Sequence, residues 1–210
     1  MYFVMSGKKA KKSKRAYTVI KRLLDVFFSA TLLIFLALPM LFIWLAVRVS
    51  SPGKGIFRQI RVGKDGGLFV CYKFRTMYES APPCCPSALF YDAEKYITPI
   101  GRFLRRASLD ELPQLFNVLK GDMSIVGPRP LILAEQDIHR QRRERGVYRL
   151  RPGLTGLSQI CGRNMISDEE KVALDTKYLY EFGFLQDARI VGKTVGRVIS
   201  GDGIDKPKNK

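Results

Sequence analysis

The sequence predicts a helix-rich α/β fold, in which a re-entrant membrane helix precedes a small β-hairpin and amphipathic helices that lie at a membrane surface. Residues 26–47 form a run of 22 residues without a charge, which is long enough to cross the hydrocarbon core of a bilayer. Two strand-like segments flank a glycine-rich turn, and later segments carry apolar residues at helical spacing. We therefore expect four parts: a basic disordered arm (1–16), a re-entrant membrane helix (17–48), a globular domain (49–200) and a polar tail (201–210).

The chain carries a net charge of +17, which indicates an anionic partner such as membrane phospholipid, nucleic acid or a phosphorylated substrate. Its four cysteines have no C-x-x-C spacing, so we expect free thiols in a reducing compartment. The single histidine, His139, excludes a histidine-rich metal site and leaves no satisfactory Ser-His-Asp triad. Neither a P-loop nor a dinucleotide-binding glycine pattern is present in the sequence.

The apolar run has basic residues on both sides, Lys21 and Arg22 among those before it and Arg48 among those after it. Because basic flanks favour the cytoplasmic side, we expect the segment to enter and leave the membrane by one face. Pro39 lies near the middle of the membrane segment and can break a helix there. A single spanning helix remains the alternative. Asp25 at the entry needs a partner, for which Lys21 or Arg22 is suitably spaced.

The next segments predict a hairpin, with strands over 56–62 and 68–74 joined by Gly63-Lys64-Asp65-Gly66-Gly67. Lys73 and Arg75 alternate with period two, so they can face one site together, although an exposed strand face would show the same pattern. Residues 79–99 are rich in proline and predict a loop.

Two adjacent carboxylates, Asp110 and Glu111, follow an arginine-rich helical segment over residues 101–106. Ser108 and Glu111 fit a capping box, which would merely begin a helix. Alternatively, Pro113 is the first helical residue and the pair lies just outside the helix. In both arrangements the pair lies at the N-terminus of a helix that buries apolar residues over 112–119 and ends at Gly121, a position that favours a phosphate.

An acidic pair among arginines can also handle a phosphorylated substrate. Asp110 can act as a nucleophile on phosphorus or as a base, and Glu111 can hold Mg²⁺, which accepts one or two carboxylates together with substrate phosphates. Four cationic side chains can offset the charge of a diphosphate: Arg105, Arg129, Lys73 and Arg75. For each arginine, a solvated or lipid-facing surface is the alternative.

Three further helices are expected. The first covers 131–145 and ends at Gly146, before a loop over 151–156 and a short strand-like piece. The second begins at a capping box, Ser167 to Glu170, and reaches about Phe182. The third covers 187–200 and has one basic and one apolar face, which suits a membrane surface or packing on the domain core.

Several motifs stand together in one order: Lys21-Arg22-Leu23-Leu24-Asp25, Phe57-Arg58-Gln59-Ile60-Arg61-Val62-Gly63, Lys73-Phe74-Arg75-Thr76-Met77, Asp110-Glu111-Leu112-Pro113-Gln114, Gly127-Pro128-Arg129-Pro130 and Arg151-Pro152-Gly153-Leu154-Thr155-Gly156. Over residues 17–185 the chain resembles the bacterial sugar transferases, the monotopic phosphoglycosyl transferases. The resemblance favours the catalytic interpretation of the acidic pair. Departures are small: Leu38 precedes Pro39 where some members have serine, and Lys54 stands where a proline is frequent.

The resemblance implies transfer of a phospho-sugar from a UDP-sugar to a polyprenol phosphate, typically undecaprenyl phosphate, with release of UMP. It implies a catalytic domain on the cytoplasmic face of the bacterial inner membrane. It assigns Asp110 as nucleophile, Glu111 as Mg²⁺ ligand, and Arg105 and Arg129 as contacts of the phosphate and nucleotide. Asp175 and Tyr178 are weaker assignments, as are Lys73 and Arg75.

The competing class is a membrane-tethered basic protein without enzymatic activity, although the chain lacks the aromatic-basic pattern of nucleic-acid binding. A related lipid phosphate is an alternative acceptor. The sequence leaves open the sugar and the oligomeric state, a dimer included.

Overall fold

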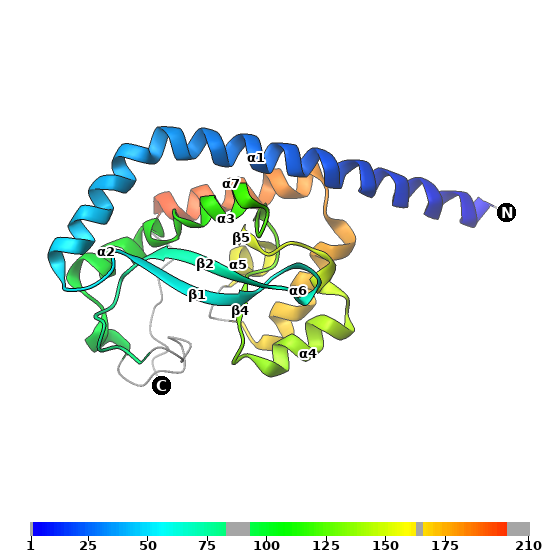
Figure 1. The fold of residues 1–210 in the computed structure, drawn as a ribbon. Coiled ribbons are helices and arrows are strands. Elements are labelled where there is room, and N and C mark those ends of the chain that lie inside the picture. Colours follow the sequence, from blue (N-terminus) through cyan, green and yellow to red (C-terminus); the bar gives the residue numbers. More distant parts are fainter. Residues whose placement is uncertain (1, 83–92, 163–165, 201–210) are drawn as a thin grey trace.

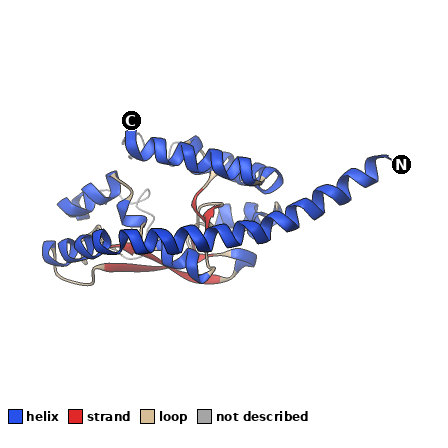
Figure 2. Ribbon diagram, turned by 90° about the horizontal axis from the view of Figure 1, so that it is seen from above, coloured by secondary structure: helices blue, strands red, loops and turns tan. Residues whose placement is uncertain are grey.

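A computed structural model describes residues 2–82, 93–162 and 166–200 of the chain. Its longest element is α1 (Tyr2–Ser50), which contains Pro39. In Figure 1 this helix crosses the top of the domain and bends in its C-terminal part. Figure 2 shows its N-terminal part extending beyond the rest of the molecule.

The N-terminal part of α1 differs from the expected disordered arm, because the helix begins at Tyr2. Alanine and lysine, which are frequent in this part, are good helix formers. Extending an existing helix also avoids the cost of nucleating a new one.

The stretch Ala16–Ser50 is long and apolar enough to cross a membrane, and its most apolar window is almost entirely unburied within the protein. Ile34 and Phe35 are each 76% exposed. An apolar surface of this size on one helix is typical of contact with lipid.

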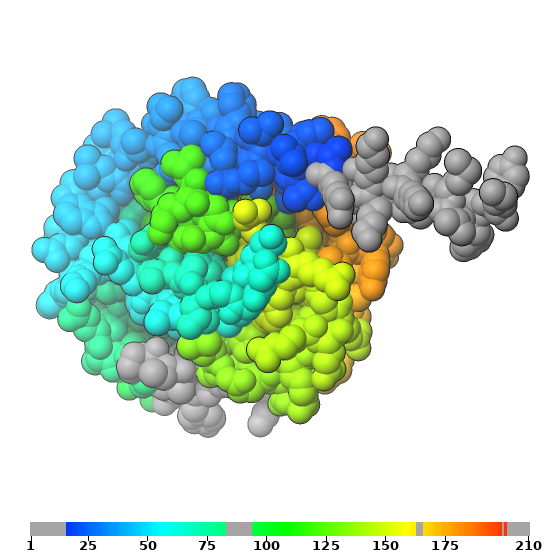
Figure 3. All heavy atoms as spheres, turned by 45° about the vertical axis from the view of Figure 1, so that its right-hand side comes forward, coloured from blue at the N-terminus to red at the C-terminus, as the bar shows by residue number. Residues whose placement is uncertain are grey.

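Near its entry, α1 is bonded to the domain. The Arg22 guanidinium donates to the carbonyl oxygens of Val118 (2.6 Å) and Leu119 (3.0 Å) at the end of α3 (Gln114–Lys120). Asp25, which is buried, accepts a hydrogen bond from the backbone N–H of Ile125 at 3.0 Å. Figure 3 shows the surface of α1 (blue) lying directly against α3 (green).

Asp187, near the start of α7 (Phe184–Ser200), accepts hydrogen bonds from two other helices. The donors are Lys21 (2.7 Å) and Tyr17 (2.8 Å) of α1 and Tyr178 (2.6 Å) of α6 (Asp168–Glu181). Lys21 also lies 3.9 Å from Asp25, as its helical spacing predicts. This cluster joins α1 to the C-terminal helices.

The other end of α1 is bonded to the same domain. Arg75 donates to the carbonyl oxygens of Val47 (3.2 Å) and Ser51 (2.6 Å) and to the Ser51 hydroxyl (2.9 Å). Val47 is buried in a cluster with Phe74 and Leu104. Both ends of the apolar helix are therefore anchored to one domain.

The predicted hairpin is confirmed. Strands β1 (Ile56–Val62) and β2 (Leu68–Phe74) pair antiparallel, and β4 (Leu131–Ile132) adds to β1, giving the order β2-β1-β4. A second, parallel pair joins β3 (Ser124–Val126) to β5 (Gly153–Thr155).

Helices surround these two small sheets (Figure 1). They are α2 (Pro99–Arg106), α3 (Gln114–Lys120), α4 (Gln136–Glu144), α5 (Leu157–Cys161), α6 (Asp168–Glu181) and α7 (Phe184–Ser200), with short 3-10 turns at Lys64–Gly66, Ala93–Tyr96, Leu109–Glu111 and Val147–Arg149. The capping box of Ser167 and Glu170 is formed, as predicted. The helix expected over 131–145 begins only at Gln136, because residues 131–132 pair with β1. The strand-like piece expected after residue 156 was wrong, because the short helix α5 lies there, and the expected loop over 151–156 contains β5 instead.

Candidate active site

The acidic pair lies in the 3-10 turn Leu109–Glu111, between α2 and α3. Ser108 is left-handed (φ 55°), and its side chain makes no capping hydrogen bond, so the capping box expected here is not formed. Pro113 is instead the residue that precedes α3. The two carboxylates thus lie just outside the helix, which was one of the two arrangements expected.

Glu111 lies between two cations that come from distant parts of the chain. Its Oε1 is 2.6 Å from the Lys73 ammonium on β2 and 3.6 Å from the Arg129 guanidinium. The Glu111 side chain is only 13% exposed, whereas that of Arg129 is 40% exposed. The arginine can therefore turn toward a ligand while Glu111 stays in place.

Asp110 is buried, and its charged neighbours are of both signs. Burial, and to a smaller extent the Glu111 carboxylate, raise the pKa of Asp110, while Lys73, Arg105 and Arg129 act to lower it. Within the described part of the chain, no group donates a hydrogen bond to the Asp110 carboxylate. No donor among the described residues therefore has to be displaced before this carboxylate attacks a substrate.

Arg105, in the last turn of α2, contributes to this environment. Its Nε donates to the Thr76 hydroxyl at 2.9 Å, which orients the guanidinium from the side of β2. Together with Lys73 and Arg129, Arg105 gives three of the four predicted cations a place around the acidic pair.

The remaining predicted residues lie elsewhere. Arg75 does not share the face of Lys73, because β2 ends at Phe74, and it binds the end of α1 instead. Asp175 is buried in an ion pair with Arg142, and Tyr178 is bonded to Asp187.

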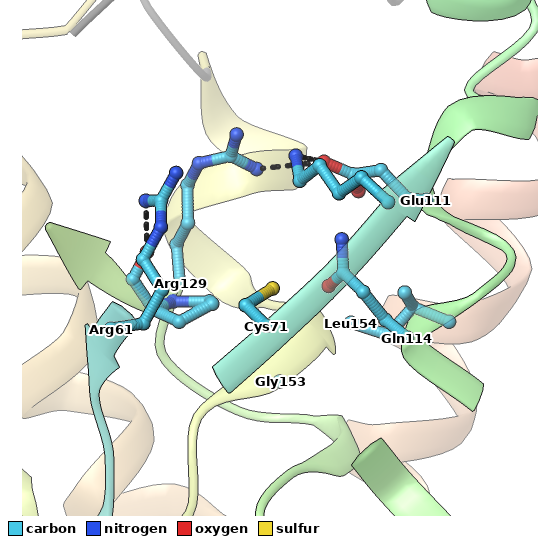
Figure 4. Close-up of a pocket in the computed structure, with 9 residues that line it drawn as sticks. Arg61, Cys71, Glu111, Gln114, Arg129, Gly153 and Leu154 are labelled. Carbon is cyan, nitrogen blue, oxygen red and sulfur yellow. Dashed lines mark hydrogen bonds and ion pairs between the residues drawn. The ribbon is translucent and has the colours of Figure 1, made fainter. Parts of the chain in front are cut away.

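A small pocket that is open to solvent lies beside Glu111 (Figure 4). Its lining includes three cations, Arg61, Lys73 and Arg129, and the other lining residues apart from Glu111 are uncharged: Cys71, Gln114, Pro130, Gly153 and Leu154. Arg61, Cys71 and Gln114 were not singled out from the sequence. A signal was available for Cys71, which alternates with Lys73 on β2.

Comparison with known proteins identifies the family of this chain. The family model of the bacterial sugar transferases matches residues 16–201. The chain belongs to this family. The region matched includes α1 from residue 16 onward, the acidic pair and the pocket, so the resemblance of the motifs is confirmed.

Individual relatives are similar along nearly the whole of this sugar transferase. It is 37% identical over 206 residues to the undecaprenyl-phosphate galactose phosphotransferase of Salmonella typhimurium, a match that covers 91% of this chain but 43% of that protein. It is 39% identical over 188 residues to the uncharacterized sugar transferase EpsL of Bacillus subtilis, covering 90% and 91% of the two chains. It is 39% identical over 191 residues to the UDP-glucose:undecaprenyl-phosphate glucose-1-phosphate transferase of Caulobacter vibrioides, covering 87% and 70%. The chain thus spans less than half of some relatives and nearly all of others.

The segment that carries Arg129 is held firmly in this sugar transferase. Arg61 donates to the carbonyl oxygen of Pro130 at 2.9 Å, and Arg142 donates to that of Arg129 at 2.8 Å. Gly127 and Gly153 bring two backbones so close that a Cβ on Gly153 would lie 2.1 Å from the Gly127 nitrogen. The loop is therefore fixed while its arginine side chain remains accessible.

The acidic pair offers two carboxylates to a metal ion. Among the described residues, no three His, Cys, Asp or Glu side chains gather as a complete set of metal ligands. Two adjacent carboxylates nevertheless fit Mg²⁺, which is held by one or two carboxylates with water and substrate phosphates completing its shell. Asp110 adds weight to this fit, since its burial disfavours an uncompensated negative charge.

Proposed function

We propose that this sugar transferase moves a sugar-1-phosphate from a UDP-sugar to a polyprenol phosphate, undecaprenyl phosphate in bacteria, and releases UMP. The observation that carries the proposal is the Asp110 carboxylate, buried without a hydrogen-bond donor in the described chain and facing the field of Lys73, Arg105 and Arg129. The names of the Salmonella and Caulobacter relatives support the lipid acceptor and the transferred phospho-sugar.

The reaction has two displacements at one phosphorus. An Asp110 oxygen attacks the phosphorus that bears the sugar, the bond from this phosphorus to the bridging oxygen breaks, and UMP leaves with the electron pair. A phosphate oxygen of the polyprenol phosphate then attacks the same phosphorus, and the Asp110 carboxylate leaves. The products are a polyprenyl diphosphate sugar and the regenerated enzyme, so a difficult transfer is split into two easier ones.

The charges of the reacting groups indicate which residues assist the transfer. The attacking carboxylate and the diphosphate are both anionic, so their approach is unfavourable without nearby cations. Arg129 and Arg105 offer planar guanidinium groups that match phosphate oxygens, and Lys73 adds a positive charge on the pocket side. When bound, Mg²⁺ would neutralise charge on the donor phosphates, and we propose that Glu111 holds it.

For topology, we propose that α1 is re-entrant, with the domain at the cytoplasmic face of the inner membrane. The support is that Arg22 and Asp25 at one end of the apolar run, and Val47 and Ser51 at the other, bond to one domain. A straight helix over this span would be about 40 Å long and would place its ends on opposite sides of a hydrocarbon core of about 30 Å. The bend of α1 in Figure 1, together with Pro39 within the helix, would let α1 leave the membrane by the face through which it entered.

The decisive test is the covalent intermediate. Full-length protein in lipid nanodiscs is incubated with UDP-sugars without acceptor, and its intact mass is measured together with the UMP released. Wild type should gain the mass of one phospho-sugar, and Asp110→Asn should gain none. The matched control, Asp137→Asn, makes the same change at an exposed residue of α4 and should behave as wild type. Turnover that persists in Asp110→Asn would refute the nucleophile.

Two further measurements complete the test. EDTA should stop UMP release and Mg²⁺ should restore it, whereas full activity without divalent metal would remove the role given to Glu111. A panel of UDP-hexoses and UDP-N-acetylamino sugars should identify the donor. If no UDP-sugar yields UMP with polyprenol phosphate present, the chain is a membrane-tethered basic binding protein instead.

A further inference from the structure

Gln114 is a buried amide with an unusual environment. It is the first residue of α3 and only 2% exposed, yet it lines the pocket beside Glu111. Within the described part of the chain, its side chain makes no hydrogen bond. Its amide atoms are not among the fully buried unpaired polar atoms, so their hydrogen bonds are left to water or to a ligand in the pocket.

Asn117, one turn later on the same helix, provides the comparison. It is also buried, but its amide nitrogen donates to the Val70 carbonyl oxygen (2.7 Å) and to Asp122 (3.1 Å). Its amide oxygen accepts from the backbone N–H of Tyr72 at 3.1 Å. The short helix α3 thus carries one buried amide whose hydrogen bonds are made within the protein and one whose hydrogen bonds are not.

The direction of the unbonded amide is visible in Figure 4. The Gln114 amide points into the pocket, on the side opposite Arg61 and Arg129. Glu111 is drawn above Gln114 on the same side, and the uncharged Cys71 and Leu154 also line the pocket. The Gln114 amide offers one donor and one acceptor, which suits an uncharged polar group better than a phosphate, because the amide oxygen repels an anion.

We propose that Gln114 recognises an uncharged polar group of the donor substrate, one that both donates and accepts hydrogen bonds, while the cationic side of the pocket holds its diphosphate. This proposal rests on the proposed function. Two parts of a UDP-sugar have that chemistry: the hydroxyl or acetamido groups of the sugar, and the imide edge of the base. In either case Gln114 is a specificity-determining residue, because an amide left unpaired by the wrong ligand penalises its binding.

The test compares Gln114→Leu with Gln114→Asn, which keeps the amide but shortens its reach. Gln141→Leu on α4 makes the same chemical change outside the pocket and is the matched control. Each full-length variant is reconstituted in lipid nanodiscs. Thermal unfolding, the Kd of UMP and CMP by calorimetry, and KM and kcat for a panel of UDP-sugars are then measured.

Two results would support the proposal, and they distinguish recognition of the base from recognition of the sugar. If the base is recognised, Gln114→Leu weakens UMP binding and raises the KM of every UDP-sugar by a similar factor, roughly 10- to 100-fold for a lost buried hydrogen bond, and preference over CMP falls. If the sugar is recognised, UMP binding is unchanged, while the KM rises for the preferred UDP-sugar and preference among sugars is lost. In both cases unfolding should be unchanged or shifted upward, since the unpaired amide is gone.

One pattern overturns the proposal: wild-type UMP affinity, KM and sugar preference in Gln114→Leu. Lower thermal stability with unchanged affinity would also overturn it, because Gln114 would then serve only the fold. Failure of the proposed function looks different, since wild type itself would release no UMP from any UDP-sugar. In that event the inference stands only if wild type binds UMP and Gln114→Leu does not.

Discussion

Asp175→Asn is expected to destabilise this sugar transferase strongly without touching the pocket. The Asp175 Oδ2 lies 2.5 Å from the Arg142 NH2, and the two side chains are 1% and 3% exposed. Ser158 donates to the other carboxylate oxygen at 2.9 Å. Neutralising Asp175 would leave the Arg142 charge buried without its counter-ion.

The magnitude follows from that geometry. Removing one member of a buried ion pair costs about 3–5 kcal/mol, and in a chain of this size 1 kcal/mol corresponds to about 2–4 °C in Tm. We therefore expect Tm to fall by roughly 6–20 °C. Because Arg142 also donates to the Arg129 carbonyl oxygen, the KM for the donor should rise at temperatures where the variant is folded.

The assay is thermal unfolding in nanodiscs, with Asp137→Asn as the exposed control. The double variant Asp175→Leu/Arg142→Met removes both charges, and it should recover most of the lost stability. An Asp175→Asn protein that melts within 1 °C of wild type, yet releases no UMP, would refute the structural role. Asp175 would then be assigned to the active site.

Three further outcomes are expected. Adduct formation should decline as pH falls through the pKa of Asp110, which burial places above its ordinary value of about 3.9. Because the raised pKa means that the folded protein holds this proton more tightly than the unfolded chain, the ionised carboxylate destabilises the fold at neutral pH. Asp110→Asn should therefore melt at a higher temperature than wild type at neutral pH. Lys73→Met removes the largest influence that lowers this pKa, so the acid limb of the rate profile should move to higher pH, and an unmoved limb would contradict the assignment. Arg75→Met should lower stability by roughly 1–3 kcal/mol through the lost bonds to Val47 and Ser51 and leave the KM for the donor unchanged; a raised KM with unchanged Tm would return Arg75 to the substrate.

Local signals predicted the elements that depend on local interactions. The hairpin follows from alternation around an Asp-Gly turn, and α6 begins where Ser167 and Glu170 cap each other. The acidic pair was located by its motif, and its position outside α3 was one of two alternatives that Pro113 left open.

Tertiary contacts decided what the sequence could not. Arg75 was grouped with Lys73 by period two, but the strand ends at Phe74 and the guanidinium turns to α1 instead. Asp175 finds its partner 33 residues away, and no spacing rule relates two such positions. That Gln114 has no side-chain partner in the described part of the chain likewise depends on which groups the fold brings near it, and no local pattern in the sequence encodes this.

The bonds that Lys21 and Tyr17 make with Asp187 also bear on how the protein is made. They join residues separated by 166 and 170 positions. During synthesis α1 leaves the ribosome well before Asp187, which is translated more than 160 residues later. The bonds between them can form only after that, and contacts of such long range form slowly. A nascent chain halted before α7 would have its membrane anchor but not the carboxylate that fastens the anchor to the enzyme.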